Sequence, residues 1–200
     1  MADVQQLERE RIEQKQQHRR ALRVGGLEIR PARRDEMTMV AGFVRSSAEW
    51  YRPLLDDKDM AEHDVDERWA QKNFELRDFY IGSTEGEPVG TISLQYFGEL
   101  AYLGYIYLDV AQVGRGFGQD LMRFAERKAR EADMSGLALI AHPEATWAKR
   151  AYLKYGFEIV ETEKARVLAW QDGVLRPYYE EGFELYLYRF DAKRDRRARA

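Results

Sequence analysis

Residues 102–122 read Tyr-Leu-Gly-Tyr-Ile-Tyr-Leu-Asp-Val-Ala-Gln-Val-Gly-Arg-Gly-Phe-Gly-Gln-Asp-Leu-Met. The aromatic and β-branched run from Tyr102 to Val110 predicts a half-buried strand. Gly114, Gly116 and Gly118 then predict a tight turn that leaves successive backbone N–H groups uncovered. A helix that begins near Gly118 adds its own unpaired N–H groups and the positive end of its dipole. This stretch therefore predicts a binding site for a phosphate or a pyrophosphate.

Two familiar nucleotide loops fit this stretch poorly. A P-loop requires a Gly-Lys pair followed by Ser or Thr, and the chain contains no such triplet. A dinucleotide fingerprint that starts at Gly114 and Gly116 requires a third glycine where Gln119 stands. The P-loop is excluded, and the dinucleotide fingerprint is disfavoured.

The segment Val113-Gly-Arg-Gly-Phe-Gly118, placed after an aromatic strand, resembles the acyl-CoA pyrophosphate loop of the GNAT superfamily of N-acetyltransferases. The resemblance continues in an apolar strand at Leu137–Ala141 and in the segment 147–157, which carries a tyrosine and ends in Gly-Phe. The chain departs from the family pattern at Val113, where Arg or Gln is usual, and at Ala145, where Asn is common. The resemblance implies an α/β (α+β) fold with a mixed, mostly antiparallel central sheet of six to seven strands flanked by helices.

The resemblance also implies acetyl-CoA as a cosubstrate and an N-acetyltransferase activity. The backbone of the end of the strand would pair with the pantetheine arm, and the N–H groups of the loop would take the pyrophosphate. The cofactor-binding residues expected on this basis are Leu108, Val110, Val113, Gly114, Arg115, Gly116, Phe117, Gly118 and Gln119. Tyr152, five residues before Phe157, occupies the position of the family's general acid. A phenol with a pKa of about 10 can protonate a departing thiolate, although a residue that merely packs on the sheet remains the alternative reading of Tyr152.

Four residues near the expected strand ends are candidates for the general base: Glu99, Tyr102, His142 and Glu144. Glu99 and His142 are the preferred candidates. The other histidines show no spacing for a zinc site, so no metal is expected. The chain has no Gly-x-Ser-x-Gly elbow, which favours direct attack by the acceptor over an acyl-enzyme.

Two segments outside the motifs combine aromatic and charged residues, namely 49–53 and 176–182. They are expected to line the acceptor cleft, where Tyr178, Tyr179, Glu180 and Glu181 would hold a cationic substrate through ring faces and carboxylates. A solvated turn explains the second segment equally well. A polyamine, an aminoglycoside, an amino acid and a protein N-terminus all remain open as the small-molecule or peptide amine acceptor.

Composition supports a globular enzyme. The 200 residues are 44% hydrophobic and 12% aromatic, and the absence of cysteine excludes disulfides, thiolate metal sites and a cysteine nucleophile. The net charge is −3, but residues 24–188 hold 20 basic against 29 acidic side chains. An acidic body suits a cationic amine better than nucleic acid, which is the disfavoured partner. No apolar run approaches the ~20 residues that span a bilayer, so a cytoplasmic protein without membrane contact is expected.

Three segments are expected: a helical extension at 1–23, an acetyltransferase domain at 24–190 and a disordered basic tail at 191–200. A homodimer remains open, as does the alternative of a non-catalytic acyl-CoA sensor or assembly domain. The pattern further predicts helices at 3–23, 35–47 and 65–76 and strands at 27–30, 79–83, 89–97, 158–163, 166–171 and 183–190, with Asp172-Gly173 as a hairpin turn.

Overall fold

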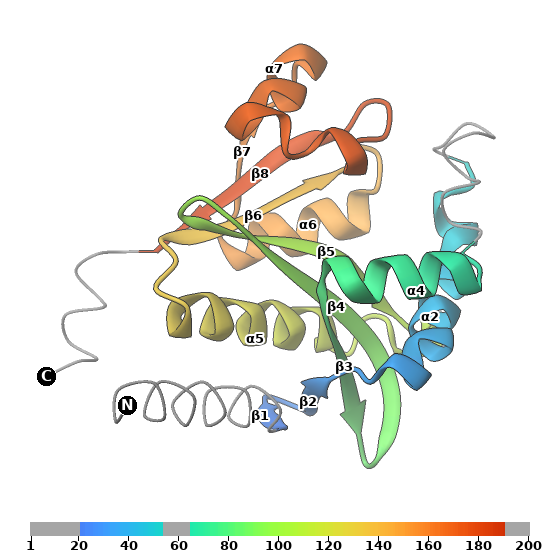
Figure 1. The fold of residues 1–200 in the computed structure, drawn as a ribbon. Coiled ribbons are helices and arrows are strands. Elements are labelled where there is room, and N and C mark those ends of the chain that lie inside the picture. Colours follow the sequence, from blue (N-terminus) through green and yellow to red (C-terminus); the bar gives the residue numbers. More distant parts are fainter. Residues whose placement is uncertain (1–20, 54–64, 191–200) are drawn as a thin grey trace, which may run out of the picture.

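The computed structural model describes residues 21–53 and 65–190, which build one sheet with helices on both faces (Figure 1). Within these residues the sheet has eight strands in the order β1-β2-β3-β4-β5-β6-β8-β7. The strands are β1 Leu22–Val24, β2 Leu27–Pro31, β3 Asp78–Thr84, β4 Glu87–Phe97, β5 Leu100–Leu108, β6 Gly136–Ala141, β7 Glu158–Glu161 and β8 Glu184–Arg189. The α-helices are α2 Met37–Tyr51, α4 Glu67–Leu76, α5 Phe117–Glu131, α6 Thr146–Tyr155 and α7 Lys164–Ala169. The 3-10 helices are η1 Arg34–Glu36, η2 Val110–Gln112, η3 Trp170–Gly173 and η4 Arg176–Tyr178.

The sheet is antiparallel except where β5 meets β6. These two strands run parallel and pair over only three residues each, Leu100–Tyr102 with Gly136–Ala138. Beyond this point β5 continues to pair with β4, and β6 continues to pair with β8. The sheet therefore splits between β5 and β6. A mixed, mostly antiparallel sheet flanked by helices confirms the predicted fold class.

A β-bulge reorients the second half of β5. Ser93 of β4 pairs with Gly104 and Thr91 pairs with Tyr107, so two residues of β5 stand opposite the single residue Ile92. Tyr105, inside the bulge, adopts a φ of +48°, which is unusual for a bulky side chain. One extra residue shifts the alternation of side chains. The bulge therefore turns Tyr105 and Tyr107 towards the face covered by α2 and α4.

Helices cover both faces of the sheet, as Figure 1 shows. Helices α5 and α6 lie on one face, and four side chains of α5 are buried against the sheet: Leu121, Met122, Ala125 and Ala129. Helices α2 and α4 lie on the other face of the β3–β5 half. The segment from α7 to η4 packs over the β6–β8 half through Val167 and Leu175. Each half of the split sheet thus packs against its own helical segment on this side.

Two predicted elements are wrong. Leu22 and Arg23 were assigned to the end of a helix, but they belong to β1, which pairs with β2 through the Gly25-Gly26 turn. This extra strand brings the sheet to eight strands instead of six to seven. The run 166–171 was assigned to a strand, but it contains the end of α7 and the start of η3, and Asp172-Gly173 lies in η3 instead of a hairpin turn. Only the four residues 167–170 of this run are apolar, and so short an apolar run does not distinguish helix from strand. In the structure Val167, on α7, is buried beside Leu185.

The other predicted elements are confirmed with shifted ends. Helix α2 is preceded by η1 and extends to Tyr51, four residues beyond its predicted end. The strand predicted to reach Val110 ends at Leu108, and η2 begins at Val110. Residues 3–20 of the helix predicted at 3–23 and the basic tail expected at 191–200 lie outside the described residues.

Candidate active site

Two adjoining cavities open at the split between β5 and β6. The first, which we call the loop cavity, has a volume of about 410 Å³ and lies between the end of β5, the glycine loop and α6. The second, which we call the tyrosine cavity, has a volume of about 320 Å³ and lies between the diverging parts of β5 and β6 and the segment 176–183. Four side chains line both cavities: Tyr51, Ile106, Tyr107 and Tyr152. The two cavities therefore meet at this group of residues.

The loop that borders the first cavity depends on two glycines. Gly114 and Gly116 both have a φ of +88°, a conformation that other residues adopt only with strain. A Cβ atom at either position would meet no atom within 4 Å, so the space in front of the loop is open. Gly116 is also the N-cap of the 15-residue helix α5. The loop thus presents bare backbone in front of the positive end of a helix dipole.

The backbone N–H groups of this loop are poised for an anion. Among the described residues, the N–H groups of residues 114–118 donate no hydrogen bond. At the two ends of the expected set the N–H groups are engaged: Val113 donates to the carbonyl of Val110 at 3.4 Å, and Gln119 donates to the carbonyl of Gly116 at 3.0 Å. The expectation that Val113 and Gln119 also offer their N–H groups is therefore wrong for this structure. Five successive free amides remain, which suits a pyrophosphate.

The side chains of the loop have separate tasks. Phe117 is buried in the main core, and Arg115 stacks its guanidinium 5.1 Å from the Phe117 ring while donating to the side chain of Gln112 at 2.6 Å. Neither Arg115 nor Phe117 lines the loop cavity with its side chain, whereas the other expected cofactor-binding residues do. Gln119 donates from its side-chain amide to the carbonyl of Ala151 at 2.9 Å. Gln119 thereby connects the start of α5 to α6.

The end of β5 leaves one edge of its backbone towards the cavity. The N–H of Asp109 donates to the carbonyl of Val89 at 2.9 Å, so the backbone groups of Leu108 point to the opposite edge, away from β4. On that edge the Leu108 carbonyl accepts a hydrogen bond from the hydroxyl of Ser47 at 3.2 Å. Val110 lies in η2, outside the strand, with its side chain 40% exposed. Strand-like pairing with a ligand is thus available at Leu108 and not at Val110.

Tyr152 lies where the two cavities meet. Its ring packs edge-on against Phe157 and Tyr186, with ring centres 6.1 and 5.8 Å apart respectively. Burial raises the pKa of the Tyr152 phenol, and the neighbouring Tyr51 adds to the shift. Tyr152 therefore holds its proton throughout the physiological pH range. A protonated hydroxyl at a junction between two cavities can serve as a proton donor.

Not all of the candidate bases lie at the cavities. Tyr102 and His142 line the tyrosine cavity, and Nδ1 of His142 accepts a hydrogen bond from the N–H of Glu144 at 3.2 Å. Burial raises the pKa of the Tyr102 phenol, which makes this residue a poor base. Glu99 lies in the β4–β5 turn, at the opposite end of β5 from the bulge, and pairs with Arg189 at 2.6 Å. The structure does not bring Glu99 to either cavity, which argues against Glu99 as the base.

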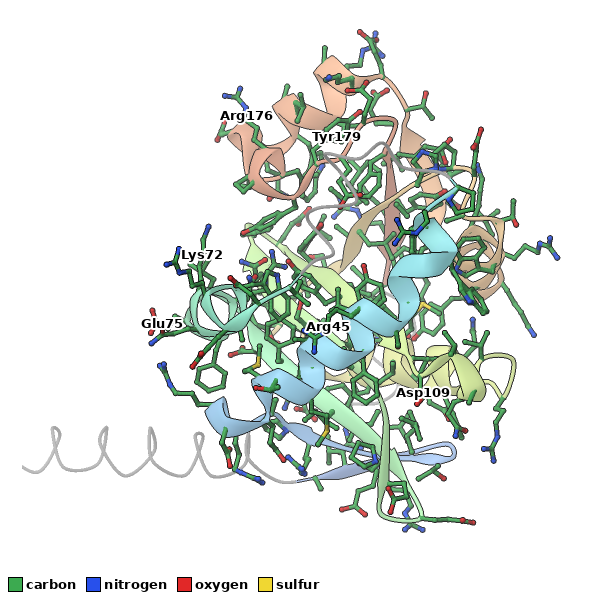
Figure 2. The ribbon with its side chains drawn as sticks, turned by 90° about the vertical axis from the view of Figure 1, so that its right-hand side faces the viewer. Arg45, Lys72, Glu75, Asp109, Arg176 and Tyr179 are labelled. Carbon is green, nitrogen blue, oxygen red and sulfur yellow. The ribbon has the colours of Figure 1, made fainter. Side chains whose placement is uncertain are left out.

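The late segment supplies much of the wall of the tyrosine cavity, as its composition suggested. Tyr178, Tyr179 and Glu180 line the cavity, whereas Glu181 pairs with Lys164 at 2.5 Å outside it. Figure 2 shows Tyr179 on one side of α2 and Asp109, which precedes the glycine loop, on the other. Burial, with the charge of Glu180, raises the pKa of Tyr51 to about 12. Glu180 thus brings a negative charge to the junction of the cavities.

Several residues of the site were not predicted from the sequence. Trp147 packs edge-on against Trp50 and Tyr51 at 5.6 and 5.4 Å, which closes one side of the loop cavity. Arg150 and Lys154 on α6 also line this cavity and add positive charge there. Their spacing of four residues, which places them on one face of a helix, was a readable signal. Arg77 lines the tyrosine cavity, and no local pattern marked it.

The described part of the chain contains no group of three or more His, Asp or Glu side chains that could hold a metal ion. No helix in residues 21–53 or 65–190 has the length and apolar character needed to cross a membrane.

Comparisons with known proteins agree with this geometry. Residues 40–157 match the family model described as the Acetyltransferase (GNAT) family. No curated protein sequence matches the chain.

Solved structures share the fold at low sequence identity. The PaiA N-acetyltransferase from Thermoplasma acidophilum, in complex with coenzyme A, is 14% identical with a TM-score of 0.64, over 83% of this chain and 100% of that chain. A GNAT-family acetyltransferase from Staphylococcus aureus Mu50 is 14% identical with a TM-score of 0.65, over 82% and 99%. RimL, a ribosomal L7/L12 alpha-N-protein acetyltransferase in complex with coenzyme A, is 18% identical with a TM-score of 0.63, over 86% and 99%. At these identities the likeness establishes the fold alone.

Proposed function

This chain belongs to the acetyltransferase (GNAT) family, and we propose that it transfers an acetyl group from acetyl-CoA directly to a primary amine. The observation that carries the proposal is the run of free N–H groups at residues 114–118, in a loop that lines the same cavity as the open strand edge at Leu108 and Tyr152. These three features would hold the diphosphate, the pantetheine arm and the thioester respectively. Structures of similar fold that hold coenzyme A support the same assignment.

The donor would bind along the loop cavity. The amides of residues 114–118 and the dipole of α5 would hold the pyrophosphate, and Arg150 and Lys154 would attract its charge. The backbone of Leu108 would pair with the pantetheine arm. The loop cavity meets the tyrosine cavity at the group that includes Ile106 and Tyr152, and the acetyl thioester would lie there.

The reaction requires four groups: the acceptor amine, a backbone N–H for the carbonyl oxygen, the Tyr152 hydroxyl and a base. The nitrogen lone pair of the neutral amine attacks the thioester carbonyl carbon, and the carbonyl oxygen becomes negative. A backbone N–H of β5 near the bulge would stabilise that oxygen. The C–S bond then breaks, and the sulfur takes the proton of the Tyr152 hydroxyl. The amine loses its extra proton to a base and finally to solvent, which also returns a proton to Tyr152.

The acceptor amine would enter through the tyrosine cavity. Glu180 would attract an ammonium group to the junction, and the aromatic wall formed by Tyr178 and Tyr179 offers ring faces to a cation. Of the two preferred candidates for the base, only His142 lines this cavity. Its Nδ1 accepts the N–H of Glu144, so the proton of the amine would have to reach the other ring nitrogen, with a water molecule as the relay.

Release of free CoA thiol tests the proposal. The full chain is mixed with acetyl-CoA and a panel of polyamines, aminoglycosides, amino acids and N-terminal peptides, and thiol is followed with a chromogenic disulfide. Acceptor-dependent thiol supports an enzyme. Saturable binding of acetyl-CoA with no thiol from any amine would instead identify a non-catalytic acyl-CoA sensor.

Initial rates test the direct transfer. Donor and acceptor occupy different cavities, so a ternary complex is expected, with intersecting lines in double-reciprocal plots. Parallel lines and an acetylated protein in the absence of amine would contradict direct transfer.

A further inference from the structure

Arg77 differs from the other buried charges of the described residues. The buried charged side chains are Glu36, Arg77, Asp120 and Lys128. Three of them form ion pairs: Glu36 with Arg30 at 2.6 Å, Asp120 with Arg123, and Lys128 with Glu131 at 2.7 Å. Arg77 is only 7% exposed, and it forms no ion pair with any residue in 21–53 or 65–190. A buried charge without a counter-ion is costly.

The contacts of Arg77 leave part of its guanidinium available. Nε donates to the side-chain oxygen of Asn73 at 3.0 Å. The rings of Tyr105 and Tyr178 lie 4.7 and 4.3 Å from the guanidinium carbon and stack on it. Stacking uses the faces of the guanidinium, whereas its N–H groups donate within the plane. The terminal nitrogens therefore remain able to bind an acceptor in the tyrosine cavity, which Arg77 lines.

Two other arginines that stack on a ring also have a carboxylate partner, whereas the exposed Arg115 stacks on Phe117 and donates to Gln112. Arg34 lies 5.1 Å from the Phe74 ring and also pairs with Glu75 at 3.2 Å. Arg130 lies 4.0 Å from the Phe190 ring and also pairs with Glu126 at 2.9 Å. Both are more exposed than Arg77 and so need a counter-ion less. The missing anion at Arg77 is therefore best supplied by a ligand.

We propose that the acceptor is a small amine that also carries a carboxylate, which binds the guanidinium of Arg77. This inference rests on the proposed acetyl transfer and specifies its substrate class. The cavity holds charges of both signs, because Glu180 lies near the junction and raises the pKa of Tyr51, whereas Arg77 stacks on Tyr105 and Tyr178. A zwitterion placed with its ammonium towards Glu180 and its carboxylate towards Arg77 matches this distribution.

The spacing of the two ends suits a single small molecule. Tyr107 lines the junction with the loop cavity, and Tyr105, two residues earlier in β5, stacks on Arg77. Two residues of a strand span about 7 Å. An amine and a carboxylate separated by a few bonds can therefore reach the acetyl group and the guanidinium together. In a protein N-terminus the α-carboxyl of the first residue is an amide, so only an acidic side chain could supply a carboxylate at this distance from the amine.

Matched acceptors provide the test. Phenylalanine, methionine and lysine are compared with their α-carboxamides, which keep the shape and lose the charge of the carboxylate. We expect kcat/KM for the preferred amino acid to exceed that of its amide by about 30-fold or more. Arg77→Lys and Arg77→Gln should each raise KM for the amino acid by about 30-fold and leave KM for acetyl-CoA unchanged. The preference for the acid over the amide should disappear in both variants.

Arg34→Gln is the matched control, because Arg34 also stacks on an aromatic ring but lies outside the cavity. It should change neither KM. Circular dichroism and coenzyme A binding establish whether each Arg77 variant is folded. Arg77→Gln is the variant more at risk of misfolding. If Arg77→Gln is not folded, the result for Arg77→Lys decides the test.

Binding gives a readout that needs no turnover. In calorimetry on the coenzyme A complex, N-acetylphenylalanine should bind more tightly than N-acetylphenylalaninamide, with the difference lost in Arg77→Lys. If amines and amides are acetylated as efficiently as amino acids, the inference that the acceptor carries a carboxylate is overturned. The proposed acetyl transfer would still stand. Absence of both turnover and binding for every amino acid, with acetyl-CoA still bound, would overturn the carboxylate inference, and absence of turnover with every other amine of the panel as well would overturn the proposed transfer.

Discussion

The side-chain amide of Gln119, in the first turn of α5, donates a hydrogen bond of 2.9 Å to the backbone carbonyl of Ala151 in α6. Ala151 directly precedes Tyr152, so this bond holds the proposed proton donor in register with the loop that would bind the pyrophosphate. Loss of the bond should move Tyr152 more than it weakens the loop, because the free amides begin at residue 114 and end at residue 118.

Gln119→Leu should therefore separate the two functions. We expect kcat to fall by roughly an order of magnitude through displacement of Tyr152. The free energy of unfolding should fall by about 1 kcal/mol, the usual contribution of one hydrogen bond. The Kd of coenzyme A should change less than twofold. Steady-state kinetics and calorimetry measure the two effects, and an equal loss in Kd would assign Gln119 to the pyrophosphate instead.

Gly116→Asp should remove coenzyme A binding. The new carboxylate would stand in the open space before the free amides and repel the pyrophosphate, so Kd should rise at least about tenfold. Gly86→Asp is the matched control: Gly86 has a φ of +86° and open space around it, but it lies in the β3–β4 turn. Both variants should lose about 1 kcal/mol of stability from backbone strain. Equal coenzyme A affinity in the two variants would remove the loop from the donor site.

Tyr152→Phe should reduce turnover without reducing donor affinity. The hydroxyl supplies the proton for the thiolate, and its loss should lower kcat by about 100-fold. Tyr155→Phe, one turn further along α6, removes a hydroxyl that donates to Glu126 at 2.5 Å, and it should leave kcat unchanged. Because burial raises the pKa of Tyr152, its proton is retained above the ordinary phenol pKa of about 10. Undiminished kcat in Tyr152→Phe would restrict this tyrosine to packing.

Glu36 should dominate the loss of stability in acid. Its carboxylate accepts from Arg30 at 2.8 and 2.6 Å and from the N–H of Arg33 at 2.8 Å, and the Arg30 hydrogen bond is the main cause that lowers its pKa to about 2. A lowered pKa in the folded state stabilises the protein above pH 4.5, and that stability is lost as the pH falls towards 2. The contribution is about 3 kcal/mol at neutral pH.

Glu36→Gln should thus lower the free energy of unfolding at pH 7 and flatten its decline between pH 4.5 and 2. Asp35→Asn, at a neighbouring exposed carboxylate that pairs with Arg33, should change stability by less than about 0.5 kcal/mol. Denaturant unfolding at pH 7, 4 and 3 provides the measurement. A parallel acid decline in Glu36→Gln and the unaltered protein would show that other groups carry the effect.

The glycine loop was predictable because its signal is local. The positive φ of Gly114 and Gly116 requires glycine, and the helix that follows needs only its own residues to expose free amides. The order of elements around the loop added the fold class. Helix and strand ends were less predictable, as Tyr51 and Val110 illustrate, because packing against distant elements decides them.

The bulge at Tyr105 and the site of Arg77 were not predictable from sequence. The bulge depends on the register of β5 against β4, and no residue pattern within β5 marks it. Arg77 is one of 32 basic residues, and its significance depends on burial and on stacking against Tyr178, which lies far along the chain. The aromatic and acidic composition of 176–182 did indicate the right cavity wall, although not which acid faces inward.

Because β5 and β6 pair only briefly and then diverge, the donor and the acceptor would be bound by two different kinds of chemical group. On one side of the divergence the proposed donor contacts are amides that every amino acid possesses. On the other side the acceptor would meet side chains from β5, from the segment 176–183 and from Arg77, which substitution can replace one at a time. A change in the preferred amine should therefore require few substitutions, all of them remote from the loop. The groups that bind the thioester donor would stay the same.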